Sequence, residues 1–203
     1  MIRKPLIAPA FATACALALV AASASAQQQS ESYKFLQAVK DAKGNDVISM
    51  LDKPGSSVVN ARSVETGEGA LHIVVKRGDM TYLRYLLQKG ADANIRDKAG
   101  TTPLLQAVRS GQVDMIPVLI AGRANPNLGD QSGVTPLILA TQMRNIDMVR
   151  QLLAAKADPD QADRIAGQSA RGYADADPRN GAIAKLYAAT PKQTRAPVAG
   201  PKL

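Results

Sequence analysis

The amino-acid sequence predicts an all-α solenoid of about five stacked helix-turn-helix units. The first observation is an internal repeat, because three similar segments begin 33 residues apart, at Gly67, Gly100 and Gly133. A fixed period of this length indicates that each repeat buries its apolar face only against its neighbours. The second observation is that Leu, Val, Ile and Ala recur with helical spacing in each repeat, whereas Trp is absent and Phe is rare. Short, closely stacked helices need a core of this kind.

The central repeat has clear helix boundaries. Thr102-Pro103 predicts a helix start, because Thr is a good N-cap and Pro fits the first helical position. Gly111 predicts the end of that helix, since Gly tolerates the left-handed conformation. Asp114 is expected to cap the second helix, and turn residues from Asn125 onward lead to the next repeat. Each unit is therefore two helices followed by an exit turn.

Two degenerate units extend the array at its ends. Terminal repeats are expected to be atypical because their outer faces meet water. We expect the units to span about residues 33–66, 67–99, 100–132, 133–166 and 167–190.

These motifs resemble the ankyrin repeat family: the Gly-x-Thr-Pro-Leu opening, the Ala-x-x-x-Gly helix end, the paired Leu-Leu of the second helix and the Gly-Ala-Asp-x-Asn exit. The resemblance covers residues 33–190. It implies paired antiparallel helices, short hairpin-like loops and a concave surface used for protein recognition, without catalytic machinery. The departures are Ala70 in place of Pro, Arg144 in place of the Gly that ends a first helix, and a His slot filled only by His72.

Residues 1–26 are predicted to be a signal peptide. Arg3 and Lys4 precede an apolar, Ala-rich run, and Ala24-Ser25-Ala26 has the small-x-small pattern of a cleavage site. We predict cleavage after this motif and a periplasmic location in a Gram-negative bacterium, with secretion as the alternative. An uncleaved membrane anchor is a further alternative, although the run is short and broken by Pro9.

The mature chain is basic and free of thiols. Removing Arg3 and Lys4 lowers the formal net charge from +8 to +6, and the only Cys lies within the leader. A chain without Cys suits an oxidising compartment and has no thiolate chemistry. Residues 27–32 and the basic, Pro-containing tail 191–203 are expected to be disordered. We expect a monomer with no stable membrane insertion after cleavage.

No residue pattern indicates catalysis or metal binding. His72 is the only histidine, and the resemblance implies that it bonds neighbouring backbone; a His/Cys metal site would need further ligands. Asp158, Asp160 and Asp163 superficially suggest calcium but lack the Gly and distal Glu of a calcium loop. Nucleophile motifs and phosphate loops are also missing. We therefore predict a protein that is not an enzyme and has no cofactor, with a hydrolase or metal-dependent enzyme as the least favoured alternative.

The expected function is that of a non-enzymatic scaffold that binds a protein partner. The inferred geometry places a set of cations on the first helices and loop tips, and we call this set the basic stripe. The basic stripe comprises Lys40, Lys76, Arg77, Arg96, Lys98, Arg109 and Arg144. It favours an acidic protein partner, although solvated helix faces also carry such residues. A secreted effector that binds a host protein is the alternative.

The basic stripe also bears on other partners and on mutagenesis. Nucleic acid is not expected, because exposed aromatics for base stacking are few and an exported protein seldom meets it. Anionic lipid is a minor alternative, because the sequence has no strongly amphipathic basic helix with bulky apolar residues. We expect that reversing Arg77 and Arg109 to Glu weakens partner binding and leaves thermal unfolding nearly unchanged.

Overall fold

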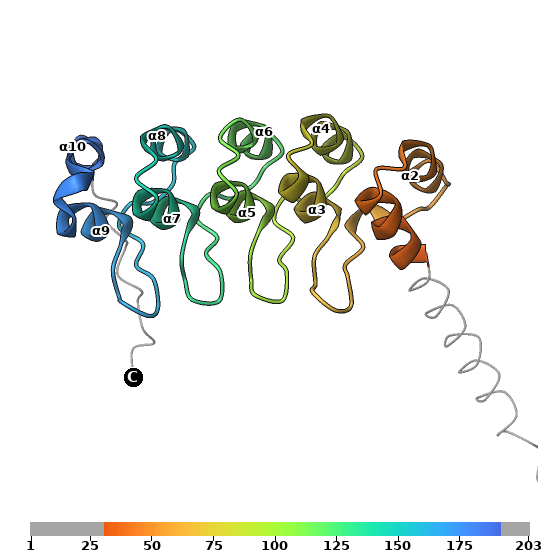
Figure 1. Cartoon of the computed structure of the whole chain (residues 1–203), viewed down its shortest axis with the longest axis horizontal. Coiled ribbons are helices and arrows are strands. Elements are labelled where there is room, and N and C mark those ends of the chain that lie inside the picture. The colour runs from red at the N-terminus through yellow and green to blue at the C-terminus, as the bar shows by residue number, and fades with distance from the viewer. Residues whose placement is uncertain (1–30, 192–203) are drawn as a thin grey trace, which may run out of the picture.

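The computed structural model describes residues 31–191 (Figure 1). The predicted leader 1–26, residues 27–30 and the tail 192–203 lie outside the described residues. Residues 31–40 are helical. The helices that follow are α2 (Gly44–Leu51), α3 (Ala70–Arg77), α4 (Met80–Gln88), α5 (Pro103–Arg109), α6 (Met115–Ala121), α7 (Pro136–Gln142), α8 (Ile146–Ala154), α9 (Ala170–Ala176) and α10 (Gly181–Ala188). Two 3-10 turns, η1 (Val58–Asn60) and η2 (Pro178–Asn180), lie between them.

The first helix starts earlier than the sequence predicts. It includes Glu31 and Ser32, which we expected in a disordered segment. The helix is fixed by its apolar face, on which Phe35 and Val39 are fully buried.

The helices form two rows along one axis. Figure 1 shows α3, α5, α7 and α9 in the row next to the hairpin loops, which we call the inner row, and α4, α6, α8 and α10 in the outer row. One cluster of buried apolar side chains runs through all units and includes Leu104, Leu119 and Leu137, each without exposed surface. Within residues 31–191 two isolated β-bridges, Arg62 with Gly69 and Ala162 with Ser169, take the place of strands. The predicted all-α solenoid is confirmed.

The inner helices start as expected. The Oγ1 atoms of Thr102 and Thr135 accept the N–H of the residue three positions later, each at 3.2 Å, and Pro follows in both cases. Asp114 stands at the N-cap position of α6, but its side chain makes no capping hydrogen bond. Its backbone is already helical (φ −70°, ψ −18°), whereas Thr102 is extended (φ −95°, ψ 161°), the conformation in which a side chain can reach back to cap.

Left-handed residues end the inner helices of successive units. Gly78 and Gly111 have φ values of 74° and 71°. Arg144 takes the equivalent position after α7 with φ 55°. A non-glycine residue in this conformation costs roughly 1–2 kcal/mol. Arg144 therefore preserves the left-handed turn that glycine forms in the two preceding units, at the cost of local backbone strain.

Asparagine side chains join consecutive units. Asn60, Asn94 and Asn127 each accept one backbone N–H of the next exit turn at 2.7 Å. Their side-chain amides donate to backbone carbonyls of that turn, at distances between 3.0 and 3.4 Å. These bonds link each exit turn to the next and help to fix the spacing of the units.

The hairpin loops are also joined at their tips. The backbone N–H groups of Lys98, Gln131 and Arg164 donate to carbonyls of the preceding tip, at 2.9, 3.0 and 2.8 Å. We call residues 63–67, 97–100, 130–133 and 163–167 the loop-tip row. Glycine permits the close approach, because a Cβ on Gly133 would lie 2.9 Å from the backbone nitrogen of Arg164.

Candidate functional site

Three members of the basic stripe share one place in the fold. Lys76 and Arg109 stand 33 residues apart in the last turns of α3 and α5, and Lys40 ends the helix of residues 31–40. All three are exposed. In α7 the equivalent residue is Gln142, so this cationic series is confined to the first three units. We call Lys40, Lys76 and Arg109 the helix-end patch.

The helix-end patch is only loosely neutralised. Lys76 pairs with Glu68, and Arg109 lies 3.4 Å from a carboxylate oxygen of Asp130. The side chains of Lys76 and Arg109 are 48% and 46% exposed. Their acidic partners are less exposed, at 20% for Glu68 and 15% for Asp130, and Arg109 Nη1 also donates to Thr101 Oγ1 at 3.3 Å. The half of each cationic side chain that faces water stays accessible to a competing carboxylate.

Arg77 has a structural role. Its Nη1 donates to the carbonyl oxygen of Val39 at 2.6 Å, and its Nη2 lies 3.0 Å from Asp79. The guanidinium also stacks over the ring of Tyr82, 5.2 Å from its centroid. Because this side chain is only 28% exposed and joins the first unit to the second, the expectation that its reversal leaves unfolding unchanged does not hold.

The remaining members of the basic stripe lie elsewhere. Arg96 Nη2 donates to the carbonyl of Gly129 at 2.5 Å, which ties two hairpin stems together. Arg144 starts from the left-handed turn and lies 3.7 Å from Asp177. Lys98 is exposed at a loop tip and forms no ion pair within residues 31–191. The structure therefore divides the stripe into the helix-end patch, the loop-tip Lys98, two arginines (Arg77 and Arg96) that bond backbone carbonyls of other units, and Arg144, which is 43% exposed and paired only at 3.7 Å.

His72 is held between two units. It is fully buried; its Nδ1 accepts the N–H of Gly69 at 3.2 Å, and its Nε2 donates to the carbonyl of Thr101 at 2.9 Å. Burial lowers the pKa of His72 from its usual value of 6.5, while the Thr101 bond opposes that shift. Both nitrogens are used by backbone, in agreement with the structural role implied by the family resemblance.

The three aspartates of the calcium-like run each bond to different protein groups and do not form a common site. Asp158 accepts the N–H of Asp160, and the Asp160 carboxylate pairs with Arg171 at 2.7 Å. Asp163 accepts three N–H groups of its own turn and the hydroxyl of Tyr173, and chiefly the Tyr173 bond lowers its pKa. Between residues 31 and 191, no group of three or more His, Cys, Asp or Glu side chains could hold a metal ion.

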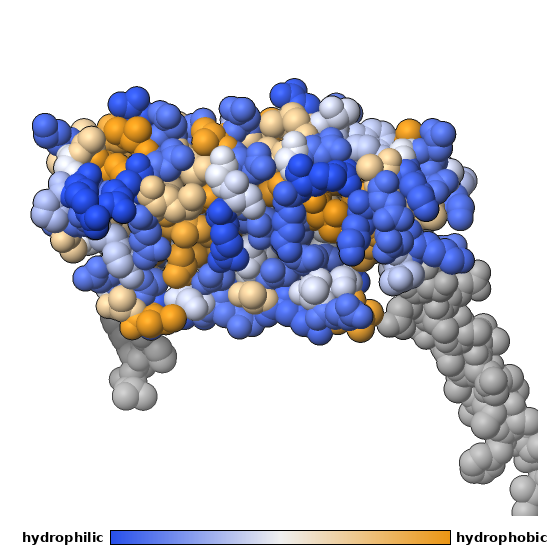
Figure 2. All heavy atoms as spheres, viewed as in Figure 1, coloured by the Kyte–Doolittle hydropathy of each residue, from blue (hydrophilic) through white to orange (hydrophobic). Residues whose placement is uncertain are grey.

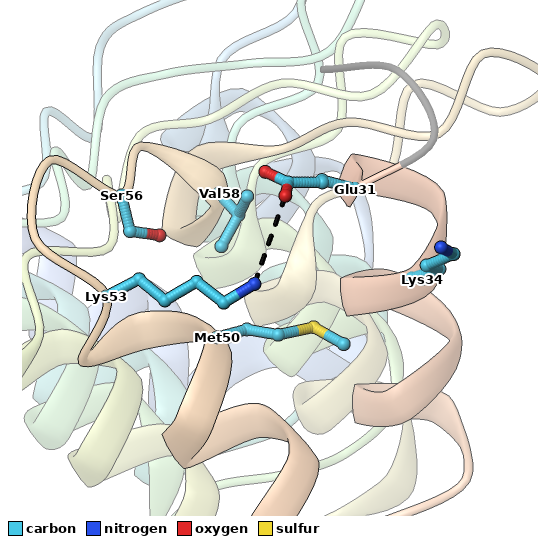
Figure 3. A pocket seen from close by; sticks show the side chains of 6 residues that line it. All are labelled: Glu31, Lys34, Met50, Lys53, Ser56 and Val58. Carbon is cyan, nitrogen blue, oxygen red and sulfur yellow. Dashed lines mark ion pairs between the residues drawn. The ribbon is translucent and has the colours of Figure 1, made fainter. Parts of the chain in front are cut away.

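A small hollow lies at the N-terminal end of the array (Figure 3). It is lined by Glu31, Lys34, Met50, Lys53, Ser56 and Val58. Lys53 reaches across it toward Glu31, with 3.9 Å between the charged atoms. This exposed ion pair lies beside a thioether and an aliphatic side chain, and the hollow presents no arrangement of nucleophile and base.

Two exposed apolar residues escaped the sequence analysis. Val64 and Ile165, at the tips of the first and last hairpin loops, are 66% and 80% exposed. The signal was present in the turn lengths, because residues 63–67 and 163–167 span one residue more than 97–100 and 130–133.

Comparison with known families gives an independent result. A family model described as ankyrin repeats in three copies matches residues 19–130 and again residues 71–163. Together these matches cover more than half of the chain, and they leave α9 and α10 outside. The first match begins inside the predicted leader. Among the helices described between residues 31 and 191, none has the length and apolarity needed to cross a membrane.

Proposed function

Because the chain belongs to the ankyrin repeat family, whose members generally bind other proteins, we propose that it is an exported, non-enzymatic scaffold that recognises an acidic protein partner. The proposed export to the periplasm rests on the leader pattern in residues 1–26. The absence of catalysis is proposed from the family and from the full use of His72 and the aspartates by the fold.

The observation that carries this proposal is the helix-end patch. Lys40, Lys76 and Arg109 repeat at one position of three successive inner helices and stay exposed. Their partners are exposed or at a loop, and the following unit has an uncharged Gln at this position. A cation near a helix C-terminus also stabilises the helix through its dipole. That effect would operate in every unit, so it does not explain why the cations occur only in the first three units.

Charge reversal at the helix-end patch tests the proposal. The test is an affinity capture with residues 27–203, which include all the residues that the structure describes. The immobilised protein is incubated with an envelope extract of the source cell, and the captured proteins are identified. We expect Lys76→Glu with Arg109→Glu to abolish capture of a specific partner, because both reversed charges repel acidic groups. The cost in unfolding free energy should stay at about 2–3 kcal/mol, since two partly exposed ion pairs and the hydrogen bond from Arg109 to Thr101 are lost.

The matched control places the same charge change on the outer helices. Arg84 in α4 and Arg150 in α8 are exposed, and neither forms an ion pair among residues 31–191. Reversing both to Glu should leave capture intact. Equal loss in both variants would show that net charge alone governs binding, and capture that survives the Lys76 and Arg109 reversal would refute the helix-end patch as the binding surface.

The export part of the proposal has its own test. Cell fractionation of the full chain, with mass spectrometry of its N-terminus, should find a periplasmic protein that begins at Gln27. Recovery from the culture medium would favour the secreted effector, and a retained leader in the membrane fraction would favour an anchor.

A further inference from the structure

The loop-tip row is apolar at both ends. Val64 and Ile165 carry the exposed apolar side chains, whereas the two tips between them carry Lys98-Ala99 and Gln131-Ser132. Figure 2 shows apolar atoms at each end of the lower edge of the molecule, the edge that the hairpin loops form in Figure 1. Among the large apolar side chains of residues 31–191, Ile165 is the most exposed, and only Ile165 and Tyr33 are more exposed than Val64.

The edge is preformed. Each tip after the first donates one backbone hydrogen bond to the preceding tip, at 2.8 to 3.0 Å. The glycines at 67, 100 and 133 allow this close contact. Binding through the loop-tip row therefore requires little ordering of the loops, which removes one of the usual entropic costs of association.

The outward charge of this edge is positive. The aspartates at 97, 130 and 163 turn inward, where they accept backbone N–H groups of their own loops. The exposed charged residues at the tips are Glu65, Lys98 and Arg164.

The distance between the two apolar tips favours a bilayer surface over a protein partner. Three repeats separate Val64 from Ile165, which corresponds to roughly 24–30 Å for helices packed 8–10 Å apart. A protein partner would have to present two apolar sites at that separation. A bilayer surface accepts isolated apolar side chains anywhere at its headgroup boundary, and anionic lipids attract nearby cations.

We propose that the loop-tip row docks on an anionic phospholipid surface. Val64 and Ile165 enter the headgroup boundary, and Lys98 and Arg164 lie against lipid phosphates. The helix-end patch shares no residue with this surface and stays available to a protein partner. This inference does not depend on the proposed protein-binding function.

Vesicle co-sedimentation tests the proposal with residues 27–203, which exclude the apolar leader. The chain should bind vesicles that contain phosphatidylglycerol and should bind pure phosphatidylcholine vesicles much less. Added salt should weaken binding. Ile165→Ser should lower the partition coefficient about tenfold, the scale expected for burial of most of one aliphatic side chain. Ile48→Ser, an exposed isoleucine on α2, is the matched control and should bind as the parent does.

Two results would overturn the proposal: no sedimentation with phosphatidylglycerol vesicles, or equal loss for Ile165→Ser and Ile48→Ser. Deleting residues 192–203 separates the tail from the tips. The truncated chain should keep its sensitivity to Ile165→Ser, and complete loss of binding on truncation alone would assign the interaction to the tail.

Fluorescence gives a second, independent readout because the chain contains no Trp. An Ile165→Trp variant carries a single indole at the tip, and its emission should shift to shorter wavelength when phosphatidylglycerol vesicles are added. The Ile48→Trp variant should not shift. An unshifted Trp at position 165 in the presence of bound vesicles would contradict insertion of the tip.

Discussion

His72 joins two units through hydrogen bonds that require a neutral imidazole. Its Nδ1 accepts from Gly69, so protonation of that nitrogen would oppose two N–H groups. Its Nε2 donates to Thr101 of the following unit. Leu105 and Ile138 fill the equivalent positions in the next two units and are buried. His72 therefore occupies a buried position that apolar side chains fill in the next two units.

The stability of the protein should depend on pH through His72. Burial holds the pKa of His72 below its usual value of 6.5 in the folded state, so the unfolded chain binds the proton more readily. The contribution of neutral His72 is complete above about pH 6.5 and is lost as the pH falls below that value toward the folded pKa. Urea unfolding between about pH 5 and pH 7 should show this loss. His72→Leu should remove that part of the dependence; an unchanged slope would refute the assignment.

Alanine substitutions at Gly133 and Gly111 test whether the close approach of the loop tips requires glycine. Both Gly133 and Gly111 have positive φ, at 79° and 71°. A Cβ at Gly133 would lie 2.9 Å from a backbone nitrogen, whereas one at Gly111 would meet nothing within 4 Å. Gly111→Ala should cost roughly 1–2 kcal/mol from conformation alone. Gly133→Ala should cost at least about 1 kcal/mol more, since packing strain adds to the same conformational cost. Equal unfolding free energies for the two variants would show that the loops part without cost.

At the scale of elements, residue type identifies the capping residues of α5 and α7 but not of α6. Thr102 and Thr135 cap α5 and α7 with the same bond length and are followed by Pro in both units. Asp114 stands before α6 without capping it. The difference lies in backbone conformation, and residue type alone does not reveal it.

Thermal or urea unfolding of two alanine variants should separate these cases. Thr102→Ala should lower the unfolding free energy by about 1 kcal/mol, because it leaves the N–H of Leu105 without its partner. Asp114→Ala should change it by less than about 0.5 kcal/mol, the usual range for an exposed side chain without a structural bond. A larger loss at Asp114 would mean that its carboxylate caps the helix in solution.

At the scale of the whole molecule, Arg171 ties the last unit to the rest of the array. Its guanidinium pairs with Asp160 in the preceding exit turn and donates to the carbonyls of Tyr187 and Thr190 at the end of the array. Tyr187 is buried beneath this contact, and burial raises its pKa to about 12. In a solenoid each unit contacts only its neighbours, so a terminal unit relies on such contacts.

Arg171→Met should therefore loosen the last unit selectively. Hydrogen exchange of the α10 amides should accelerate, while amides of α5 keep their protection, because local opening in a repeat array is independent of distant units. Arg179→Met is the control, since Arg179 pairs only with the neighbouring Asp177. Uniform acceleration in α5 and α10 would indicate that the array unfolds as a single unit.

Much of the fold could be predicted because its information is local and repeated. Thr102-Pro103 and Gly111 define a helix within a few residues, and the period copies that definition along the chain. The basic stripe could be predicted only in part. Lys76 and Arg109 are equivalent by register, whereas the engagement of Arg77 depends on the carbonyl of Val39, 38 residues away.

The sequence by itself determined the repeat, its helix boundaries, the apolar core positions and the excess of positive charge, since each follows from residue type and spacing. Tertiary structure alone decided that Arg77 and Arg96 are held by carbonyls of other units, because no local pattern identifies those partners. It also decided that Val64 and Ile165 project from one continuous edge. That edge exists because backbone hydrogen bonds between successive loops bring together tips that are about one repeat apart in the chain.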